Sequence, residues 1–98
     1  MHHDIFQSVA DQMMRGDSVE LDGKKYRVRR TSAQHLRMTE FLIDGEPFAA
    51  IEQNPDKPSR WGALARKGHK VVQIKSGTTN RFVAVVVDGE VREYGKHS

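Results

Sequence analysis

The chain has 98 residues, contains no cysteine and carries a formal net charge of +3 at pH 7. This length suits one domain with a single hydrophobic core, and the lack of cysteine excludes disulfide bonds and thiolate zinc sites as sources of stability. No stretch approaches the roughly 20 apolar residues of a membrane-spanning helix, and residues 1–16 lack the apolar core of a secretory signal, so we expect a cytoplasmic protein that binds no membrane.

Charge is arranged in blocks of alternating sign along the chain. Residues 24–37 carry six basic side chains and no acid, residues 38–56 carry five acids and no base, and residues 57–81 carry seven bases and no acid. Such blocks either pair with each other in the fold or form separate surface patches.

The first segment, from Asp4 to Gly16, has the pattern of an amphipathic helix. Asp4 is suited to cap its N-terminus, with Gln7 three residues later, and Gly16 suits the left-handed position after the last turn. We expect the apolar face of this helix to cover a sheet. The alternative is a partner-contact surface, because flexible methionines adapt to irregular surfaces. The residues of that alternative surface are Ile5, Phe6, Met13 and Met14.

After this helix the hydrophobic pattern changes to a period of two residues. Asp-Gly pairs stand at 22–23, 44–45 and 88–89 between β-prone runs. Each pair predicts a two-residue hairpin turn, because Asp and Gly tolerate positive φ. Residues 82–87 are apolar on both alternations, so this strand is expected to be central and covered on both faces. The expected strands lie near 18–21, 24–31, 36–43, 46–53, 70–76, 81–87 and 90–94.

A second, short helix is expected over residues 59–67. Ser59 is suited to cap its start and Gly68 to close its end, and a helical wheel places Trp61, Leu64 and Ala65 on one apolar side. We expect Trp61 to anchor this helix on the core with its indole N–H bonded to a polar partner. The alternative is that Trp61 stacks on a base or another ligand.

These elements predict one α+β domain over residues 1–98. It consists of an N-terminal amphipathic helix, a curved and mainly antiparallel sheet of five to seven strands built from Asp-Gly hairpins, and the short helix near 59–67.

The hairpin around 22–23 is expected to expose a row of cations. A two-residue turn pairs Glu20 with Lys25 and turns Tyr26 and Val28 inward, so that Lys25, Arg27 and Arg29 line the outer face. Such a row can follow phosphates, since each neutralised phosphate releases counterions. The alternative is an ordinary solvated face that Glu20 and the acidic block at 38–56 partly neutralise.

No pattern in the sequence indicates catalysis. The five histidines lack metal-ligand spacing, there is no thiol, and no glycine-rich phosphate loop or G-x-S-x-G turn occurs. Glu40, Glu46 and Glu52 could approach one another across the hairpin at 44–45, but carboxylates on exposed strands are ordinary. We therefore expect no enzyme activity, no cofactor and no metal site.

The leading functional hypothesis is a non-enzymatic module that binds a polyanion, nucleic acid before an acidic protein. The alternative is a protein-interaction or homodimerisation domain that uses the N-terminal helix or a sheet edge. The first hypothesis depends on the cations forming a one-sided electropositive surface. Its candidate contact residues are Lys25, Arg27, Arg29, Arg60, Arg66 and Lys67.

Overall fold

The computed structural model describes residues 2–32 and 35–94 and confirms the predicted α+β domain. Strands β3 to β8 form one six-stranded antiparallel sheet in chain order, and β1 pairs with β2 in a separate two-stranded sheet. The elements are α1 (His3–Arg15), β1 (Ser18–Leu21), β2 (Lys24–Arg27), β3 (Arg29–Arg30), β4 (Arg37–Ile43), β5 (Glu46–Glu52), α2 (Arg60–Arg66), β6 (Val71–Ser76), β7 (Phe82–Val87) and β8 (Glu90–Tyr94).

The three Asp-Gly pairs form the predicted hairpin turns. Both residues of each pair have positive φ, from 51° to 53° at the aspartates and from 75° to 82° at the glycines. This is the geometry of type I′ turns, whose twist matches that of the flanking strands. The turn at 22–23 places Glu20 opposite Lys25, as expected.

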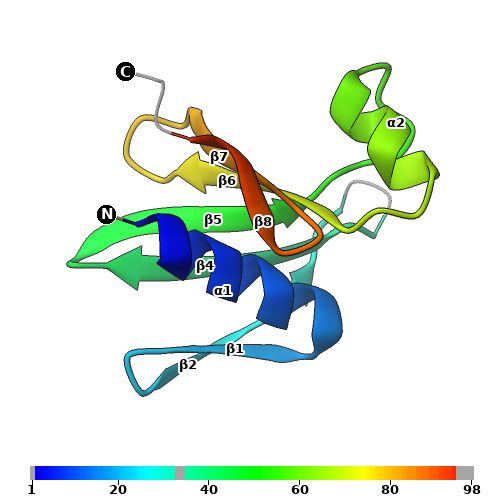
Figure 1. The fold of residues 1–98 in the computed structure, drawn as a ribbon. Coiled ribbons are helices and arrows are strands. Elements are labelled where there is room, and N and C mark those ends of the chain that lie inside the picture. Colours follow the sequence, from blue (N-terminus) through cyan, green and yellow to red (C-terminus); the bar gives the residue numbers. More distant parts are fainter. Residues whose placement is uncertain (1, 33–34, 95–98) are drawn as a thin grey trace.

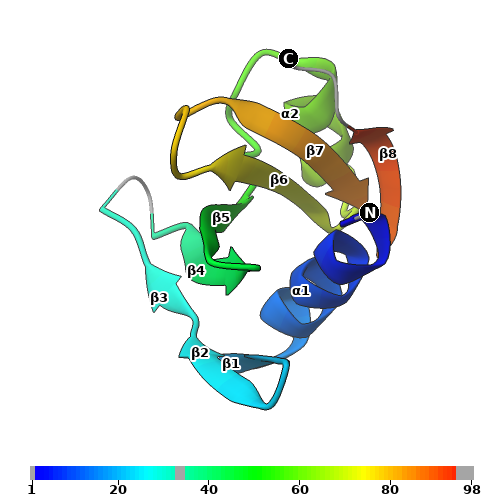
Figure 2. The ribbon, with the colours of Figure 1, turned by 90° about the vertical axis from the view of Figure 1, so that its left-hand side faces the viewer.

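The six-stranded sheet curves around α1. Figure 2 shows α1 inside the curve, with β8 on one side of it and the β1–β2 hairpin on the other. Phe6, Val9, Ala10 and Met13 are buried in a core shared with the sheet. The helix therefore covers the concave face, as predicted from its amphipathic pattern.

The burial of this face of α1 contradicts the alternative prediction that it forms a partner-contact surface. Phe6 is 1% exposed and Met13 is 0% exposed, because both pack into the core. Ile5 and Met14 are partly buried against the same core. The prediction that Phe6 and Met13 line an outer contact surface is therefore wrong for the chain on its own.

Two glutamines of α1 bond to the strands that flank the helix. The Gln12 amide donates to the carbonyl oxygen of Glu20 at 3.2 Å and accepts from the N–H of Glu20 at 3.0 Å. On the other side, the amide oxygen of Gln7 accepts from the N–H of Val91 at 3.1 Å. Side-chain amides thus pair with backbone groups of β1 and β8 where a further strand would otherwise bind.

Both ends of α1 differ from the expected caps. His2 is the N-cap without a side-chain hydrogen bond, and Asp4 lies in the first turn. Gly16 has φ −145° and ψ −169°, so it is extended and not left-handed. Asp17 links Gly16 to β1, and Arg37 from β4 donates to the carbonyl of Met14 in the last turn and to that of Gly16. These bonds take the place of the usual glycine cap.

Helix α2 lies on the convex face of the sheet (Figure 1). Trp61, Leu64 and Ala65 pack against Val71, Val85 and Val87, so β7 is covered on both faces, as predicted. The Ser59 hydroxyl accepts from the N–H of Gly62 at 3.1 Å, and Gly68 follows the helix with φ 100°. Both confirm the predicted ends of α2.

Trp61 is half-buried, and its neighbours show which way its ring faces. Its ring packs on the valine cluster from inside, while the guanidinium carbon of Arg60 lies 4.4 Å from the ring centroid. The predicted polar partner of the indole N–H does not occur among the residues that the structure describes. Trp61 therefore anchors α2 by packing and by a cation–π contact.

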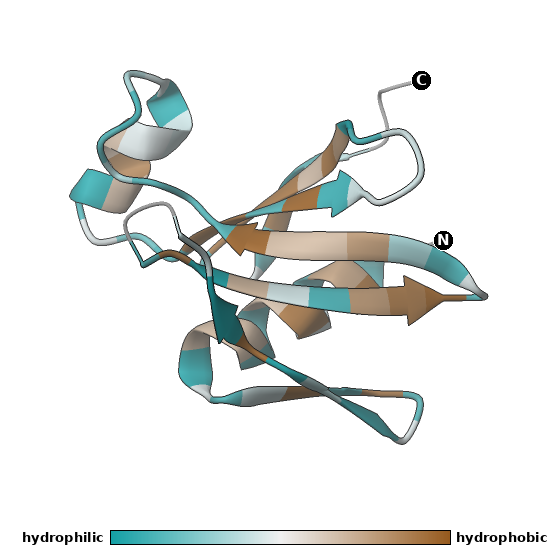
Figure 3. Ribbon diagram, turned by 180° about the vertical axis from the view of Figure 1, so that it is seen from behind, coloured by the Kyte–Doolittle hydropathy of each residue, from teal (hydrophilic) through white to brown (hydrophobic). Residues whose placement is uncertain are grey.

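Hydropathy follows the layers of the fold. Figure 3 shows apolar colour along β5 and the end of β4, and strongly hydrophilic colour at β3. In the part of the chain that the structure describes, neither helix has the length and apolar character needed to cross a bilayer.

Candidate anion-binding surface

A polar pocket of about 480 Å³ lies where the end of α1 meets the bend between β2 and β3. Four arginines and one aspartate are among its lining residues. Their formal charges give this part of the surface a basic character, which Asp17 reduces in part. We call it the arginine pocket, and its lining residues are Arg15, Gly16, Asp17, Val28, Arg29, Arg30 and Arg37.

A bend at Val28 separates β2 from β3, which carries two of these arginines. The predicted strand 24–31 is divided, because β2 ends at Arg27 and β3 begins at Arg29 in the other sheet. The N–H of Val28 donates to the carbonyl of Asp17 at 3.1 Å, and its half-buried side chain packs on the core. Arg29 pairs with Met38 and Arg30 with Arg37, so the two arginine side chains leave β3 on opposite faces. Arg30 shares the face of Arg37, and the guanidinium of Arg29 reaches Glu40 on the other face.

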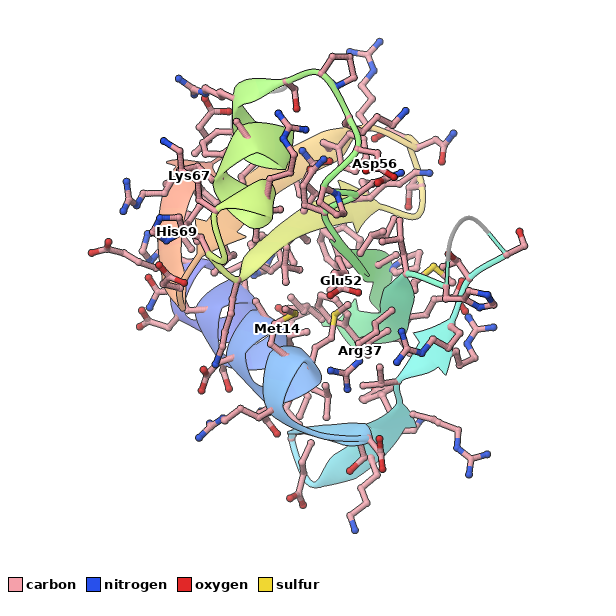
Figure 4. All side chains as sticks on the ribbon, turned by 90° about the vertical axis from the view of Figure 1, so that its right-hand side faces the viewer. Met14, Arg37, Glu52, Asp56, Lys67 and His69 are labelled. Carbon is pink, nitrogen blue, oxygen red and sulfur yellow. The ribbon has the colours of Figure 1, made fainter. Side chains whose placement is uncertain are left out.

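Arg37, the first residue of β4, bonds to the end of α1. Its guanidinium donates to the carbonyl oxygen of Met14 at 3.3 Å and to that of Gly16. Its backbone N–H donates to the Glu52 carboxylate at 3.1 Å, and Figure 4 shows these side chains gathered at the helix end. The negative end of the helix dipole also stabilises a cation at this position. Arg37 therefore has a structural role and also contributes charge to the pocket.

The other three arginines differ in their partners. Arg15 forms an ion pair with Asp11 one turn earlier in α1, and Arg29 pairs with Glu40 at 2.6 Å. The guanidinium of Arg30, in contrast, donates to the carbonyl of His35. A carbonyl occupies an N–H group but leaves the positive charge in place, so the charges of Arg30 and Arg37 stay available to an anion.

The predicted cation row on the hairpin is exposed, with Lys25 and Arg27 on its outer face. Tyr26 and Val28 are half-buried and pack on the core, as expected. Within residues 2–32 and 35–94, no carboxylate forms an ion pair with Arg27. Of the row, only Arg29 also lines the arginine pocket.

The three predicted cations of α2 lie far from the hairpin. Figures 1 and 4 place α2 and the β1–β2 hairpin at opposite ends of the molecule. Arg60 pairs with Glu93, and Arg66 donates to the carbonyls of Pro55 and Lys57. Lys67 is exposed. The six predicted cations therefore do not form the single one-sided surface that we expected.

Three pocket arginines were not among the predicted site residues. The basic block 24–37 contains Arg30 and Arg37, and that composition is the signal that could have found them. Arg15 is the last residue of α1 and is remote in sequence from that basic block. Only the fold brings it to the same space.

A histidine–carboxylate pair lies at another site, between the start of β6 and the β7–β8 turn. Nδ1 of His69 lies 2.8 Å from Asp88, and the other Asp88 oxygen accepts from the backbone N–H of Lys70 at 2.9 Å. The hydrogen bond from Lys70 and then that from His69 hold the pKa of Asp88 below its ordinary value. This arrangement ties the turn to the strand beside it.

The carboxylates of the β4–β5 hairpin do not form an acid/base pair. Glu46 and Glu52 are the first and last residues of β5, and Glu40 pairs with Arg29. Among the described residues, no three His, Asp or Glu side chains come close enough together to hold a metal ion.

Comparisons of this chain with protein-family models, with curated proteins and with solved structures find no match, so every functional statement about it has to come from its own geometry.

Proposed function

We propose that this protein is a non-enzymatic module that binds polyanions, with nucleic acid as the leading ligand, through the arginine pocket and the outer face of β2. The observation that carries the proposal is the grouping of four arginines among the residues that line one pocket of about 480 Å³. Arginine suits this role because its planar fork of N–H donors matches phosphate oxygens.

The outer face of β2 extends the basic surface beyond the pocket. Arg27 and Arg29 lie on either side of the bend at Val28, and both are exposed. Lys25 precedes Arg27 by two residues, although it faces Glu20 across the hairpin. A nucleic-acid backbone lying on this surface would meet exposed cations in succession, and each neutralised phosphate would add affinity through counterion release.

The cations of α2 are not part of this surface. They lie at the opposite end, and both of the arginines there already have partners within the fold. We therefore narrow the six predicted contact residues to Lys25, Arg27 and Arg29, and add Arg15, Arg30 and Arg37.

Titration of a labelled single-stranded oligonucleotide, followed by fluorescence anisotropy, tests the proposal. The association constant is expected to fall by orders of magnitude between about 50 and about 200 mM salt. Arg27→Gln should reduce the slope of log K against log salt by about one unit, because one phosphate contact is lost. Lys67→Gln removes the same charge from the far end and should leave the slope unchanged.

Affinity that stays flat across this salt range would contradict the proposal. Equal loss of slope in both variants would show that binding is spread over the whole molecule, and would contradict the assignment to the hairpin and the pocket.

The alternative of a protein-interaction domain receives less support. The apolar face of α1 packs on its own sheet, and Gln7 and Gln12 bond to the strands on either side of the helix. The large apolar residues that are exposed, Leu42, Phe82 and Tyr94, are 41–52% accessible. Phe82 and Tyr94 line one small pocket of about 80 Å³ on β7 and β8, and Leu42 lies on β4. Two neighbouring apolar residues and a single one are normal on a protein surface.

A further inference from the structure

We infer that the space between the diverging strands β2 and β4, which we call the wedge, binds an extended peptide strand of a partner protein in which acidic and apolar residues alternate. This interaction goes beyond polyanion binding and does not depend on it. It follows from the open edge of β4, from the pocket beside that edge and from the charges on β2.

Most of β4 has a partner strand on one side only. β3 pairs only with the first two residues of β4, and β2 belongs to the other sheet. The turn at 44–45 makes Ile43 and Glu46 a hydrogen-bonded pair, and bonded and non-bonded pairs then alternate along the hairpin. The N–H and carbonyl groups of Glu40 and Leu42 therefore point away from β5. In the part of the chain that the structure describes, these groups have no hydrogen-bond partner.

The strand on the other side of the wedge also has a free edge. Leu21 and Lys24 flank the turn at 22–23 and pair with each other, so Lys25 and Arg27 turn their backbone groups away from β1. Figure 1 shows the two hairpins as separate arms whose turns lie on the same side of the molecule. The wedge is thus bordered by two strand edges and is open toward the two turns.

Other strand edges of the fold are occupied. Gln12 bonds to the backbone of β1, and Gln7 bonds to that of β8. No side chain of the described residues does this for the open part of β4. An unpaired edge is a template for a further strand, because an extended backbone offers N–H and carbonyl groups at the same spacing. The chemistry of the edge therefore selects a peptide.

A pocket of about 380 Å³ lies against this edge, and Tyr26 of β2 and Glu40, Phe41 and Leu42 of β4 are among its lining residues. Tyr26 and Phe41 pack on the core, whereas Glu40 and Leu42 are exposed on the other face of their strand. An added strand directs alternate side chains to these two faces. Its side chains on the core side would lie between the two aromatic rings and are expected to be apolar.

The charges favour acidic residues on the outer side of the added strand. Lys25 and Arg27 are exposed on the outer face of β2, and no carboxylate of the described residues forms an ion pair with either. On β4, the Glu40 carboxylate is already paired with Arg29 at 2.6 Å. Acidic side chains between β2 and β4 would complement the unpaired cations, and basic ones would be repelled.

Other acids reduce this positive charge only in part. Glu20 faces Lys25 across the hairpin, but it lies on β1, one strand further from the wedge. Asp22 and Asp44 lie in the turns at the open end. The inner part of the wedge, beside Arg27, is therefore where an acidic residue is most favoured.

A labelled octapeptide of alternating glutamate and valine, followed by fluorescence anisotropy, provides the test. A block peptide with all glutamates before all valines has the same composition and charge, and should bind about tenfold more weakly because it cannot match both faces. In an antiparallel strand the N–H groups of the glutamates are directed to β4. N-methylation of the glutamates removes these donors and should also weaken binding about tenfold.

Leu42→Pro tests the same bonds from the side of the protein. It removes one N–H from the open edge without a change in charge, and proline already stands opposite, at position 47. It should weaken binding of the alternating peptide about tenfold. Leu42→Thr is the matched control, since it keeps the N–H and suits a strand, and it should retain most of the affinity. If Leu42→Pro does not fold by circular dichroism, the N-methylated peptide with the wild-type protein gives the answer.

Equal affinity for the alternating, block and N-methylated peptides would overturn the inference, because attraction to the basic surface alone would then account for binding. Absence of binding at low salt would overturn it as well. If Leu42→Pro weakens the labelled oligonucleotide and leaves the peptide unaffected, the wedge belongs to nucleic acid. A dimer that Leu42→Pro abolishes would assign the edge to a second copy of the chain instead.

Discussion

At the scale of single residues, Asp88 has two roles of which the sequence predicts one. Its φ of 52° serves the turn before Gly89, as the Asp-Gly pattern indicates. Its carboxylate also accepts hydrogen bonds from the N–H of Lys70 and from His69, two partners that are remote in sequence. These bonds favour the charged form and lower the pKa of Asp88 below the ordinary value of 3.8.

Asp88→Asn isolates this electrostatic role, since asparagine also tolerates positive φ and keeps the turn. Because the pKa is lowered in the folded state, the carboxylate stabilises the fold fully above its unfolded-state pKa. That stabilisation is lost as the pH falls through the folded-state pKa. The difference in unfolding free energy between wild type and variant, from urea melts below about pH 5, where an ordinary histidine is already protonated, should therefore shrink as the solution becomes more acid. A constant difference would contradict this account.

At the scale of elements, α2 depends on a close approach between its first turn and the loop before it. A Cβ built on Gly62 would overlap the carbonyl oxygen of Lys57 and would lie 3.1 Å from the carbonyl carbon. Gly62 is therefore needed for its lack of a side chain, and the loop from Asn54 to Ser59 folds directly onto the helix. Arg66 adds a second link, through its bonds to the carbonyls of Pro55 and Lys57.

Gly62→Ala should separate α2 from the convex face of the sheet. Alanine gains about 1 kcal/mol in helix propensity, but overpacking against backbone costs about 1–3 kcal/mol, so a net destabilisation is expected. The tryptophan emission of Trp61 should shift to the red as its ring leaves the valine cluster. Gly16→Ala is the matched control, because its nearest neighbouring atom would be 3.9 Å from the new Cβ. A variant as stable as wild type with unchanged emission would show that the loop moves freely.

At the scale of the whole molecule, the sheet that curves around α1 decides where the charges go. The basic blocks at 24–37 and 57–81 are visible in the sequence, but their positions depend on the bend at Val28 and on the attachment of α2 to the convex face. Arg29, Arg30 and Arg37 of the first block lie near the end of α1, and the part of the second block that is on α2 lies at the far end (Figure 1). The sequence suggests a single basic surface, whereas the fold divides the predicted cations between two separate surfaces.

Local signals account for the parts of the fold that could be predicted. Each two-residue Asp-Gly turn sets the register of its hairpin. The apolar side chains on both alternations of β7 require cover on both faces of the strand. The parts that were missed depend on distant partners. Gly16 is extended where Arg37 bonds to the helix end, and Arg15 and Arg30 line the same pocket only after α1 has packed on the sheet. No pattern within a short stretch of sequence carries such information.

The same packing predicts that the protein is a monomer. Its largest helix exposes no apolar face, and side-chain amides bond to β1 and β8 beside α1. Light scattering at increasing concentration should give a constant mass near 11.2 kDa. A mass that doubles on concentration would instead support a dimer through another strand edge.

The bond between Gln7 and Val91 spans 84 positions along the chain. During synthesis this bond can form only after β8 has left the ribosome, although Phe6 of α1 can already pack on Phe41 and Phe48 of β4 and β5. A translation product that stops before β8 would therefore leave one flank of the helix without its partner strand and be a substrate for chaperones and proteases.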